Sequence, residues 1–188
     1  GVNIFLHGPP GTGKSQLARR LARELRSDLF EVSSENEDGD PVEGERRLRA
    51  YRAAQTLLSK RRSLILFDEV EDVFNDGSEF FGRKSTAQTR KAWMNRMLED
   101  APVPTFWLSN SIASVDPAFV RRFDMVIEVP IPPRTQRQRI VERACGDLVG
   151  AECVSRISES DRLSPAVVSR ATSVVRSMGK ALDAAGAE

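Results

Sequence analysis

The sequence predicts an α/β protein with a parallel sheet, followed by a smaller helical domain. Short apolar runs alternate with longer amphipathic segments through the first two thirds of the chain, which is typical of a parallel sheet covered by helices. The prolines of "VPIPPRT" at 129–135 end this alternation, because proline neither continues a strand nor lies inside a helix. We therefore expect an α/β domain over residues 1–130 and a helical domain over residues 131–188.

Five short runs rich in Val, Ile, Leu and Phe are the predicted strands. They cover residues 3–7, 29–32, 64–68, 105–109 and 125–129. Several of these runs are apolar throughout, which indicates strands that are buried on both faces of the sheet.

Amphipathic segments between and after these runs are the predicted helices. They cover residues 14–26, 43–59, 84–98, 134–145, 151–158 and 165–178. Leu17, Leu21 and Leu25 recur every four residues in the first of them, so we expect these leucines to form its apolar, buried face. Ser164 followed by Pro165 favours a helix start, because a serine hydroxyl caps helices and proline suits the first helical position.

The composition excludes several classes of protein. The net charge of +1 gives no general support for nucleic-acid binding. No apolar stretch approaches the ~20 residues that a membrane span needs, so no membrane partner is expected. A single histidine leaves little material for a histidine-based metal site. The basic residues within 46–62 are interpreted as a solvated helix face rather than a DNA contact.

The first residue indicates whether the sequence is a fragment, and the cysteines indicate the cellular compartment. Residue 1 is Gly and the first predicted strand begins almost at once, so we interpret the sequence as an excised fragment. Cys145 and Cys153 occur without a secretory signal, which fits a reducing compartment and a cytoplasmic protein. A disulfide between them is the weaker interpretation.

The stretch "GPPGTGKS" at residues 8–15 predicts a loop that binds nucleotide phosphates. Its glycines let main-chain N–H groups approach crowded phosphate oxygens, and the helix that follows adds its positive end. Lys14 brings a full charge to the β and γ phosphates, and Ser15 offers a hydroxyl to Mg²⁺. A glycine-rich turn without a ligand is disfavoured, because an apolar strand precedes the loop and an amphipathic helix follows it. The predicted nucleotide-binding residues are Gly8, Pro9, Pro10, Gly11, Thr12, Gly13, Lys14, Ser15 and Gln16.

The stretch "SLILFDEVEDVF" at 63–74 is an apolar strand that ends in adjacent carboxylates. Ligands of open parallel sheets gather at the carboxyl ends of the strands, so Asp68 is expected near Ser15, where both would hold Mg²⁺. Alternation along the strand directs Glu69 elsewhere, and we predict that it orients and deprotonates an attacking water. Glu71 and Asp72 are interpreted as solvated residues of the following turn.

Together these two motifs resemble those of the AAA+ ATPases, and the resemblance continues along the chain. "PTFWLSN" at 104–110 resembles the sensor-1 strand of the family, whose terminal polar residue, here Asn110, contacts the γ-phosphate or the attacking water. "SVDPAFVRRFDMVIEVPIP" at 114–132 resembles the arginine-finger segment. Its candidates are Arg121 and Arg122, between which the choice stays open with a slight preference for Arg122. The helical tail resembles the lid of the family.

The resemblance implies an ATPase that uses ATP and Mg²⁺. It makes Ser15 and Asp68 the metal ligands, and the catalytic residues Lys14, Glu69, Asn110, Arg121 and Arg122. In the rings of this family, usually hexamers, the finger reaches the nucleotide of the neighbour and supplies a charge worth about 10³–10⁵ in rate. Self-association is therefore expected, with hydrolysis coupled to remodelling of a macromolecular client, for which a protein is favoured over nucleic acid.

Two departures from the family pattern limit what the resemblance implies. The loop "SSENEDGDPVEGE" lacks the aromatic residue that protein-threading members present to a central pore, which disfavours threading or moves the grip to another loop such as "NDGSEFFGRKS" at 75–85. Phe80 and Phe81 of that loop are either a pore contact or, as is more common, core residues. Ala166 occupies the position at the start of the third lid helix where many members have the sensor-2 arginine, and Arg170 follows one turn later.

Two other functions stay open. A nucleotide-gated switch or assembly scaffold with little turnover would share the phosphate loop but would not depend on Glu69 for catalysis. A small-molecule P-loop kinase would consume ATP only with an added acceptor, and such kinases lack the paired "DE" followed by a sensor strand.

Overall fold

The structure is a computed structural model that describes residues 1–74 and 84–178, with Asp72 and residues 84–91 described as backbone alone. Its contacts divide the chain into two units. One comprises Gly1–Gly8 and Lys14–Glu128, and the other comprises Pro9–Gly13 and Val129–Glu188.

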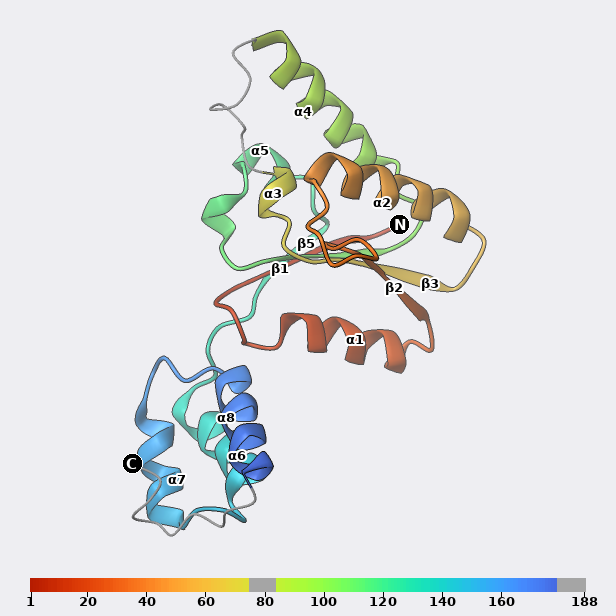
Figure 1. Cartoon of the computed structure of the whole chain (residues 1–188). Helices are drawn as coiled ribbons and strands as arrows, with labels where there is room; N and C mark the ends of the chain where they lie inside the picture. The colour runs from red at the N-terminus through yellow and green to blue at the C-terminus, as the bar shows by residue number, and fades with distance from the viewer. Residues whose placement is uncertain (75–83, 179–188) are drawn as a thin grey trace. The chain divides into compact units, whose positions relative to one another are not determined.

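A five-stranded parallel sheet forms the centre of the first unit, as the sequence predicts (Figure 1). The strands lie in the order β2-β3-β4-β1-β5, and every pairing is parallel. Their bounds differ from the predicted ones by no more than one residue at each end: β1 (Asn3–His7), β2 (Asp28–Val32), β3 (Ser63–Phe67), β4 (Thr105–Ser109) and β5 (Met125–Glu128).

The register brings three strand ends to one edge of the sheet. His7 of β1 lies opposite Ser109 of β4, and Phe67 of β3 lies opposite Trp107 of β4. The residues that directly follow these strands are Gly8, Asp68 and Asn110. The phosphate loop, the acidic pair and the sensor-type residue therefore start from neighbouring points.

Helices cover both faces of this sheet. Helix α1 (Lys14–Glu24) lies on one face in Figure 1, and four helices lie on the other: α2 (Gly44–Leu58), α3 (Glu71–Phe74), α4 (Lys84–Glu99) and α5 (Pro117–Val120). A single 3₁₀ turn, Ile112–Ser114, follows β4. The core on the four-helix face is aromatic. The ring of Trp107 is fully buried, and its centroid lies 4.7 Å from that of Tyr51 and 5.1 Å from that of Phe67.

Helix α1 buries a different face from the predicted one. Leu17, Leu21 and Leu25 are 37%, 36% and 48% exposed, whereas the buried residues are Lys14, Ala18 and Ala22. Both sets have the same four-residue spacing, and the small alanines let the helix axis approach the sheet closely. The helix also ends two residues before the predicted end. Arg26, with φ 51°, takes the left-handed conformation that closes helices, and the Ser27 N–H donates to the Ala22 carbonyl at 3.0 Å.

The strands differ in burial along the sheet. All residues of β3 and β4 are buried, as expected for strands covered on both faces. The edge strand β5 is exposed at all four positions, although its sequence "MVIE" continues an apolar pattern. An edge strand has a neighbour on one side only, here β1, so an apolar composition does not by itself ensure burial.

Up to residue 178, the second unit contains three helices, α6 (Arg134–Cys145), α7 (Ala151–Glu159) and α8 (Pro165–Ser177). Val141, Val154 and Val168, one from each helix, form its small core. Ser164 is the residue that precedes α8 and Pro165 takes the first helical position, as predicted, but the Ser164 hydroxyl makes no capping hydrogen bond. Cys145 and Cys153 are free thiols.

None of the helices in the described residues has both the length and the apolar character that crossing a membrane requires.

Candidate functional site

The loop at the head of α1 has the backbone that its glycines permit. Gly11 has φ 75° and Gly13 has φ 100°, which are values that residues with a side chain rarely adopt. At Gly11 space is limiting as well, since an added Cβ would lie 2.7 Å from the Ser164 hydroxyl oxygen within the second unit. The Gly11 carbonyl accepts a hydrogen bond from the Ala166 N–H at 3.1 Å. Of the other predicted loop residues, Thr12 donates to the Pro9 carbonyl at 3.0 Å, and Pro10 and Gln16 are exposed.

Lys14 is a buried cation at the start of α1. Its ammonium group donates to the Gly8 carbonyl at 2.8 Å and to the Asn110 side-chain oxygen at 3.1 Å. Burial lowers the pKa of Lys14, and the nearby carboxylates of Asp68 and Glu71 oppose that effect. The structure thus joins a residue of the phosphate loop to the predicted sensor residue at the end of β4.

Ser15 and Asp68 are hydrogen-bonded, as expected from the edge of the sheet at which they lie. The Ser15 hydroxyl donates to Asp68 Oδ2 at 2.8 Å, and Asp68 Oδ1 accepts the Glu69 N–H at 2.9 Å. No group of three or more His, Cys, Asp and Glu side chains suited to a metal occurs in the described residues. One carboxylate and one hydroxyl fit Mg²⁺, because this ion keeps several waters and takes its remaining oxygens from substrate phosphates.

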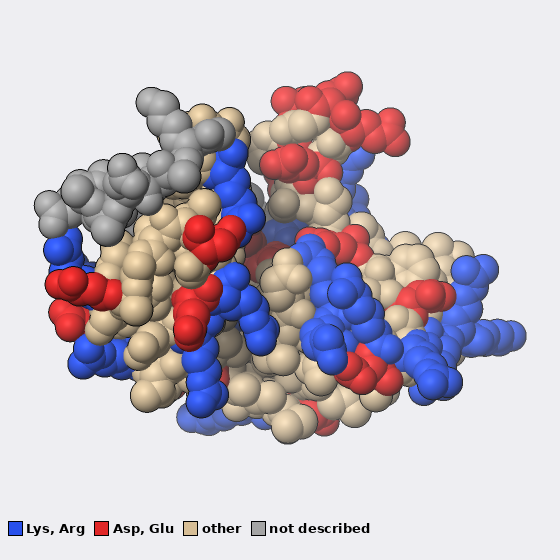
Figure 2. All heavy atoms as spheres, turned by 90° about the horizontal axis from the view of Figure 1, so that it is seen from below, with Lys and Arg blue, Asp and Glu red and all other residues tan. Residues whose placement is uncertain are grey.

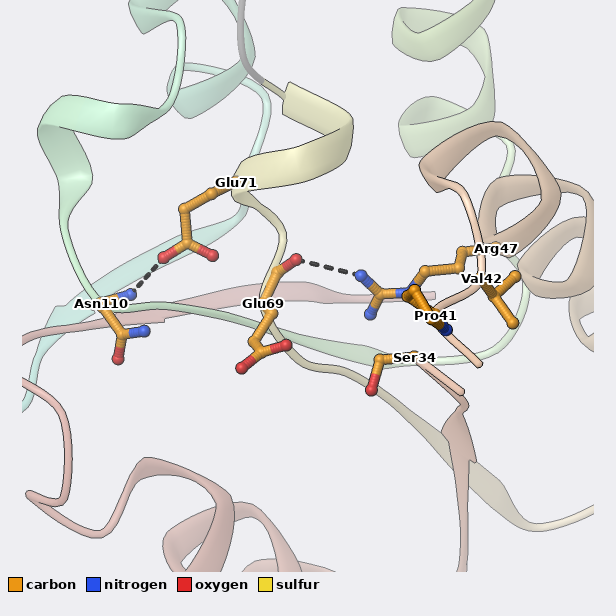
Figure 3. A pocket seen from close by; sticks show the side chains of 7 residues that line it. All are labelled: Ser34, Pro41, Val42, Arg47, Glu69, Glu71 and Asn110. Atoms are coloured by element: carbon orange, nitrogen blue, oxygen red, sulfur yellow. Dashed lines mark hydrogen bonds between the residues drawn. The ribbon is translucent and has the colours of Figure 1, made fainter. Parts of the chain in front are cut away.

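Glu69 follows Asp68 in a left-handed backbone conformation, with φ 53°. It lines a cavity of about 310 Å³ whose walls come from the ends of β3 and β4, the β2–α2 loop, α2 and the start of α3 (Figure 3). The residues that line the cavity are Ser34, Pro41, Val42, Arg47, Glu69, Glu71 and Asn110. The two residues predicted to face an attacking water, Glu69 and Asn110, therefore share one cavity.

Glu71 is not the solvated turn residue that the sequence suggested. Its Oε1 atom accepts the Asn110 N–H at 2.6 Å (Figure 3). The same atom accepts the Ser109 hydroxyl at 2.8 Å. The first turn of α3 places this carboxylate beside the end of β4, which the sequence spacing alone does not reveal. Glu71 therefore fixes the start of the segment that carries Asn110.

Arg47 is a second residue of the site that sequence reasoning missed, and the interpretation of the basic residues within 46–62 as solvated is wrong for it. It lies on α2, buried, and its guanidinium donates to the main-chain carbonyls of Asp68 and Glu69. One signal was present in the sequence. Arg47 has the same four-residue spacing as the buried residues Tyr51 and Gln55, so a charged residue occupies the buried stripe of the helix.

Arg121 and Arg122 follow α5. In the described part of the chain, neither side chain is hydrogen-bonded to the phosphate loop or to the residues at the ends of β3 and β4. Arg122 forms an exposed ion pair with Glu99 of α4. Arg121 is exposed and lines a separate, mainly apolar cavity of about 390 Å³ together with residues such as Val115 and Val120. Phe80 and Phe81 lie outside the described residues.

Comparisons with known proteins place the chain in a family. The sequence model of the AAA family, described as "ATPase family associated with various cellular activities", matches residues 4–131. The chain is 32% identical over 149 residues to the ATPase histone chaperone abo1 of Schizosaccharomyces pombe, covering 74% of this chain and 12% of that protein. It is 31% identical over 150 residues to Protein SUPPRESSOR OF K(+) TRANSPORT GROWTH DEFECT 1 of Arabidopsis thaliana, covering 77% of this chain and 34% of that protein.

A solved structure shares the fold. The AAA domain of FIGL-1 in complex with ADP aligns with a TM-score of 0.63 at 21% identity, covering 94% of this chain and 62% of the other. The chain thus spans only a minor part of the length of both curated relatives but nearly all of its own length in the structural alignment. Because the family model covers well over half of the chain, the protein belongs to the AAA family of ATPases.

Proposed function

We propose that the protein binds Mg²⁺-ATP at the head of α1 and hydrolyses it, and that an oligomeric ring couples hydrolysis to the remodelling of a macromolecular client. The observation that carries this proposal is the pair of hydrogen bonds from Lys14 to Asn110 and from Ser15 to Asp68. They connect the phosphate loop to the ends of β3 and β4, where the chemistry of a terminal phosphate would take place.

Binding relies on the main chain and on one cation. The amides of residues 8–15 and the positive end of α1 receive the phosphate oxygens. The Lys14 ammonium is already buried, and it exchanges its carbonyl and amide partners for phosphate oxygens. The Ser15 hydroxyl and the Asp68 carboxylate would hold Mg²⁺, which neutralises phosphate charge when bound.

Hydrolysis relies on Glu69 and Asn110. The Glu69 carboxylate accepts a proton from a water in the cavity as the water oxygen bonds to the γ-phosphorus, and the bond to the β–γ bridging oxygen breaks. The Asn110 amide orients the water or a γ-phosphate oxygen without adding charge. ADP and inorganic phosphate are the products.

A neighbouring copy supplies the finger. Arg122 is paired with Glu99, whereas Arg121 is exposed beside an apolar cavity, which favours Arg121 over Arg122 for this role. The helical segment after residue 130 would serve as the lid. The fission-yeast relative is named a histone chaperone, which supports a macromolecular client for this chain as well.

Glu69→Gln tests the proposal and separates it from a nucleotide-gated switch. The amide keeps the size of the side chain but cannot accept the proton, so phosphate release should fall by about 10²–10⁴-fold while ATP affinity is retained. Phosphate release and binding of a fluorescent ATP analogue are the measurements, with Glu24→Gln on the exposed surface of α1 as the matched control. Equal phosphate release by the wild type and Glu69→Gln would contradict the proposal.

A further inference from the structure

Arg47 carries a buried positive charge that the proposed chemistry has not used. Only 2% of its surface is exposed, although it is a full cation. A guanidinium cannot lose its proton at any accessible pH, so a buried one persists only where acceptors surround it. The identity of those acceptors indicates what the charge is for.

The described acceptors of Arg47 belong to the acidic end of β3. Its Nη1 donates to the Glu69 carbonyl at 3.1 Å, and its Nη2 donates to the Asp68 carbonyl. Its guanidinium carbon lies 4.5 Å from the centre of the Phe67 ring, within the range of a cation–π contact. Arg47 thus contacts three consecutive residues, from the last of the strand to the proposed general base. Figure 3 shows the guanidinium directed at the main chain of Glu69.

The backbone at this point adopts an unfavourable conformation. Glu69 has a side chain and yet has φ 53°, a region that non-glycine residues occupy only when the surroundings fix them there. The N–H of Glu69 bonds to Asp68 Oδ1, and the next N–H, that of Val70, bonds to the Leu108 carbonyl at 3.1 Å. These two bonds hold the amides of the turn. Arg47 holds its carbonyls.

We propose that Arg47 is a positioning residue for Glu69. Its planar fork binds the Asp68 and Glu69 carbonyls, which lie on either side of the Glu69 Cα, and thereby fixes the left-handed turn that directs the Glu69 carboxylate into the cavity they share. This inference rests on the proposed ATPase function. It adds that the general base is aligned from α2, a helix that contributes no predicted nucleotide ligand.

Arg47→Met tests the proposal, because methionine keeps much of the length of the side chain but has no donor. Displacing the turn should lower kcat for phosphate release by about 10²-fold and leave the Kd for ATP nearly unchanged. Arg47→Lys keeps the charge but cannot reproduce the fork, so it should also lower kcat. Arg49→Met is the control, since Arg49 lies on the same helix, exposed and paired with Glu45, and it should behave as the wild type.

A double-mutant cycle distinguishes positioning from general support of the fold. Once Glu69→Gln has removed the base, Arg47→Met should cause little further loss of kcat, because it acts through that base. Thermal unfolding identifies variants that fail to fold, and if Arg47→Met is one, Arg47→Lys decides. Wild-type kcat in the folded variant, an equal loss of kcat and ATP affinity, or multiplication of the two losses in the cycle would each overturn the inference.

Phosphate release by the wild type and by Arg47→Lys distinguishes failure of the proposed ATPase function from failure of the positioning role. If the wild type releases no phosphate that depends on Glu69, the ATPase proposal fails and the positioning role fails with it. If the wild type does so and folded Arg47→Lys has the wild-type kcat, only the positioning role is wrong.

Discussion

The ends of β3 and β4 and the segment from α5 to β5 belong to the same unit, but they differ in how they are held. At the first region the strands are buried, and Lys14, Ser15 and Glu71 bond directly to the residues that follow them. At the second, β5 is exposed and Arg121 lies at the surface. The first region is complete within one chain, whereas the second presents a cation and apolar surface outward.

From this difference we infer that one copy of the protein binds the nucleotide and aligns the water, while another copy supplies the arginine. Binding and alignment of the water depend on groups that are already fixed, so one chain suffices for them. In the proposed function, the charge that stabilises the phosphoryl-transfer transition state comes from this exposed segment, whose exposure suits delivery to another copy. Variants at the two regions should therefore respond differently to protein concentration and to mixing.

The largest effect is expected for Arg121→Ala. Loss of a finger in trans should lower kcat by about 10³-fold while ATP binding is retained, because each nucleotide site remains intact. Arg122→Ala should lower kcat far less, since its guanidinium is paired with Glu99. Steady-state phosphate release at protein concentrations that support assembly is the measurement.

Mixing shows whether the finger acts in trans. Arg121→Ala keeps an intact nucleotide site, and a variant with a damaged phosphate loop keeps an intact finger. Neither should hydrolyse ATP alone, and together they should regain part of the activity. Absence of any recovery, or a larger loss for Arg122→Ala than for Arg121→Ala, would show that the comparison of the two regions is wrong.

The next largest effect is expected for Lys14→Met, which should weaken ATP binding but stabilise the nucleotide-free protein. Loss of the buried ammonium should weaken ATP binding by about 10²-fold. In the nucleotide-free protein, burial lowers the pKa of Lys14, so its charged form is less favourable in the folded than in the unfolded state. The stabilising contribution of such a group is fully present above its unfolded pKa and is lost as pH falls through its lower folded pKa. Below that pKa, the charge on Lys14 opposes folding.

Lys14→Met should therefore raise Tm without nucleotide while abolishing the rise in Tm that ATP causes in the wild type. Differential scanning calorimetry with and without Mg²⁺-ATP measures both. Lys60→Met, at an exposed lysine after α2, is the control and should change neither. A lower Tm for nucleotide-free Lys14→Met would show that the hydrogen bonds of the ammonium outweigh its desolvation.

The sequence predicted the parts of this molecule that depend on local patterns. The strands at 3–7 and 105–109 were predicted with their observed bounds, because an apolar run between turn-forming residues is a local signal. The proximity of Ser15 and Asp68, which the structure shows as a hydrogen bond, followed from two motifs and the rule that parallel strands end at one edge.

The remainder depends on packing, which spacing does not encode. Leu17 and Ala18 belong to equally regular stripes of α1, and only the sheet decides that the alanines are buried. Glu71 and Arg47 acquire their roles from the residues that the fold brings beside them, which are distant in sequence. The exposure of β5 likewise depends on its place at the edge of the sheet rather than on its composition.

The smallest effect is expected for Tyr51→Phe, within the network through which α2 supports the start of β4 at Thr105. Burial raises the pKa of Tyr51 to about 12 from 10.0, and its hydroxyl accepts a hydrogen bond from Gln55 at 2.8 Å. Because the folded pKa lies above the unfolded one, this contribution to stability is fully present below pH 10 and is lost as pH rises toward 12. Tyr51→Phe should cost about 1 kcal/mol at pH 8, since one buried hydrogen bond is lost. That deficit should shrink or reverse by pH 11, because phenylalanine has no proton to release.

Denaturant unfolding at pH 8 and at pH 11 measures the free energy of unfolding of both proteins. Met125→Leu, on the exposed edge strand, is the control and should be as stable as the wild type at both pH values. A deficit that stays constant with pH would mean that burial does not raise the pKa of Tyr51. The buried centre of the sheet would then differ less from the exposed edge than the comparison states.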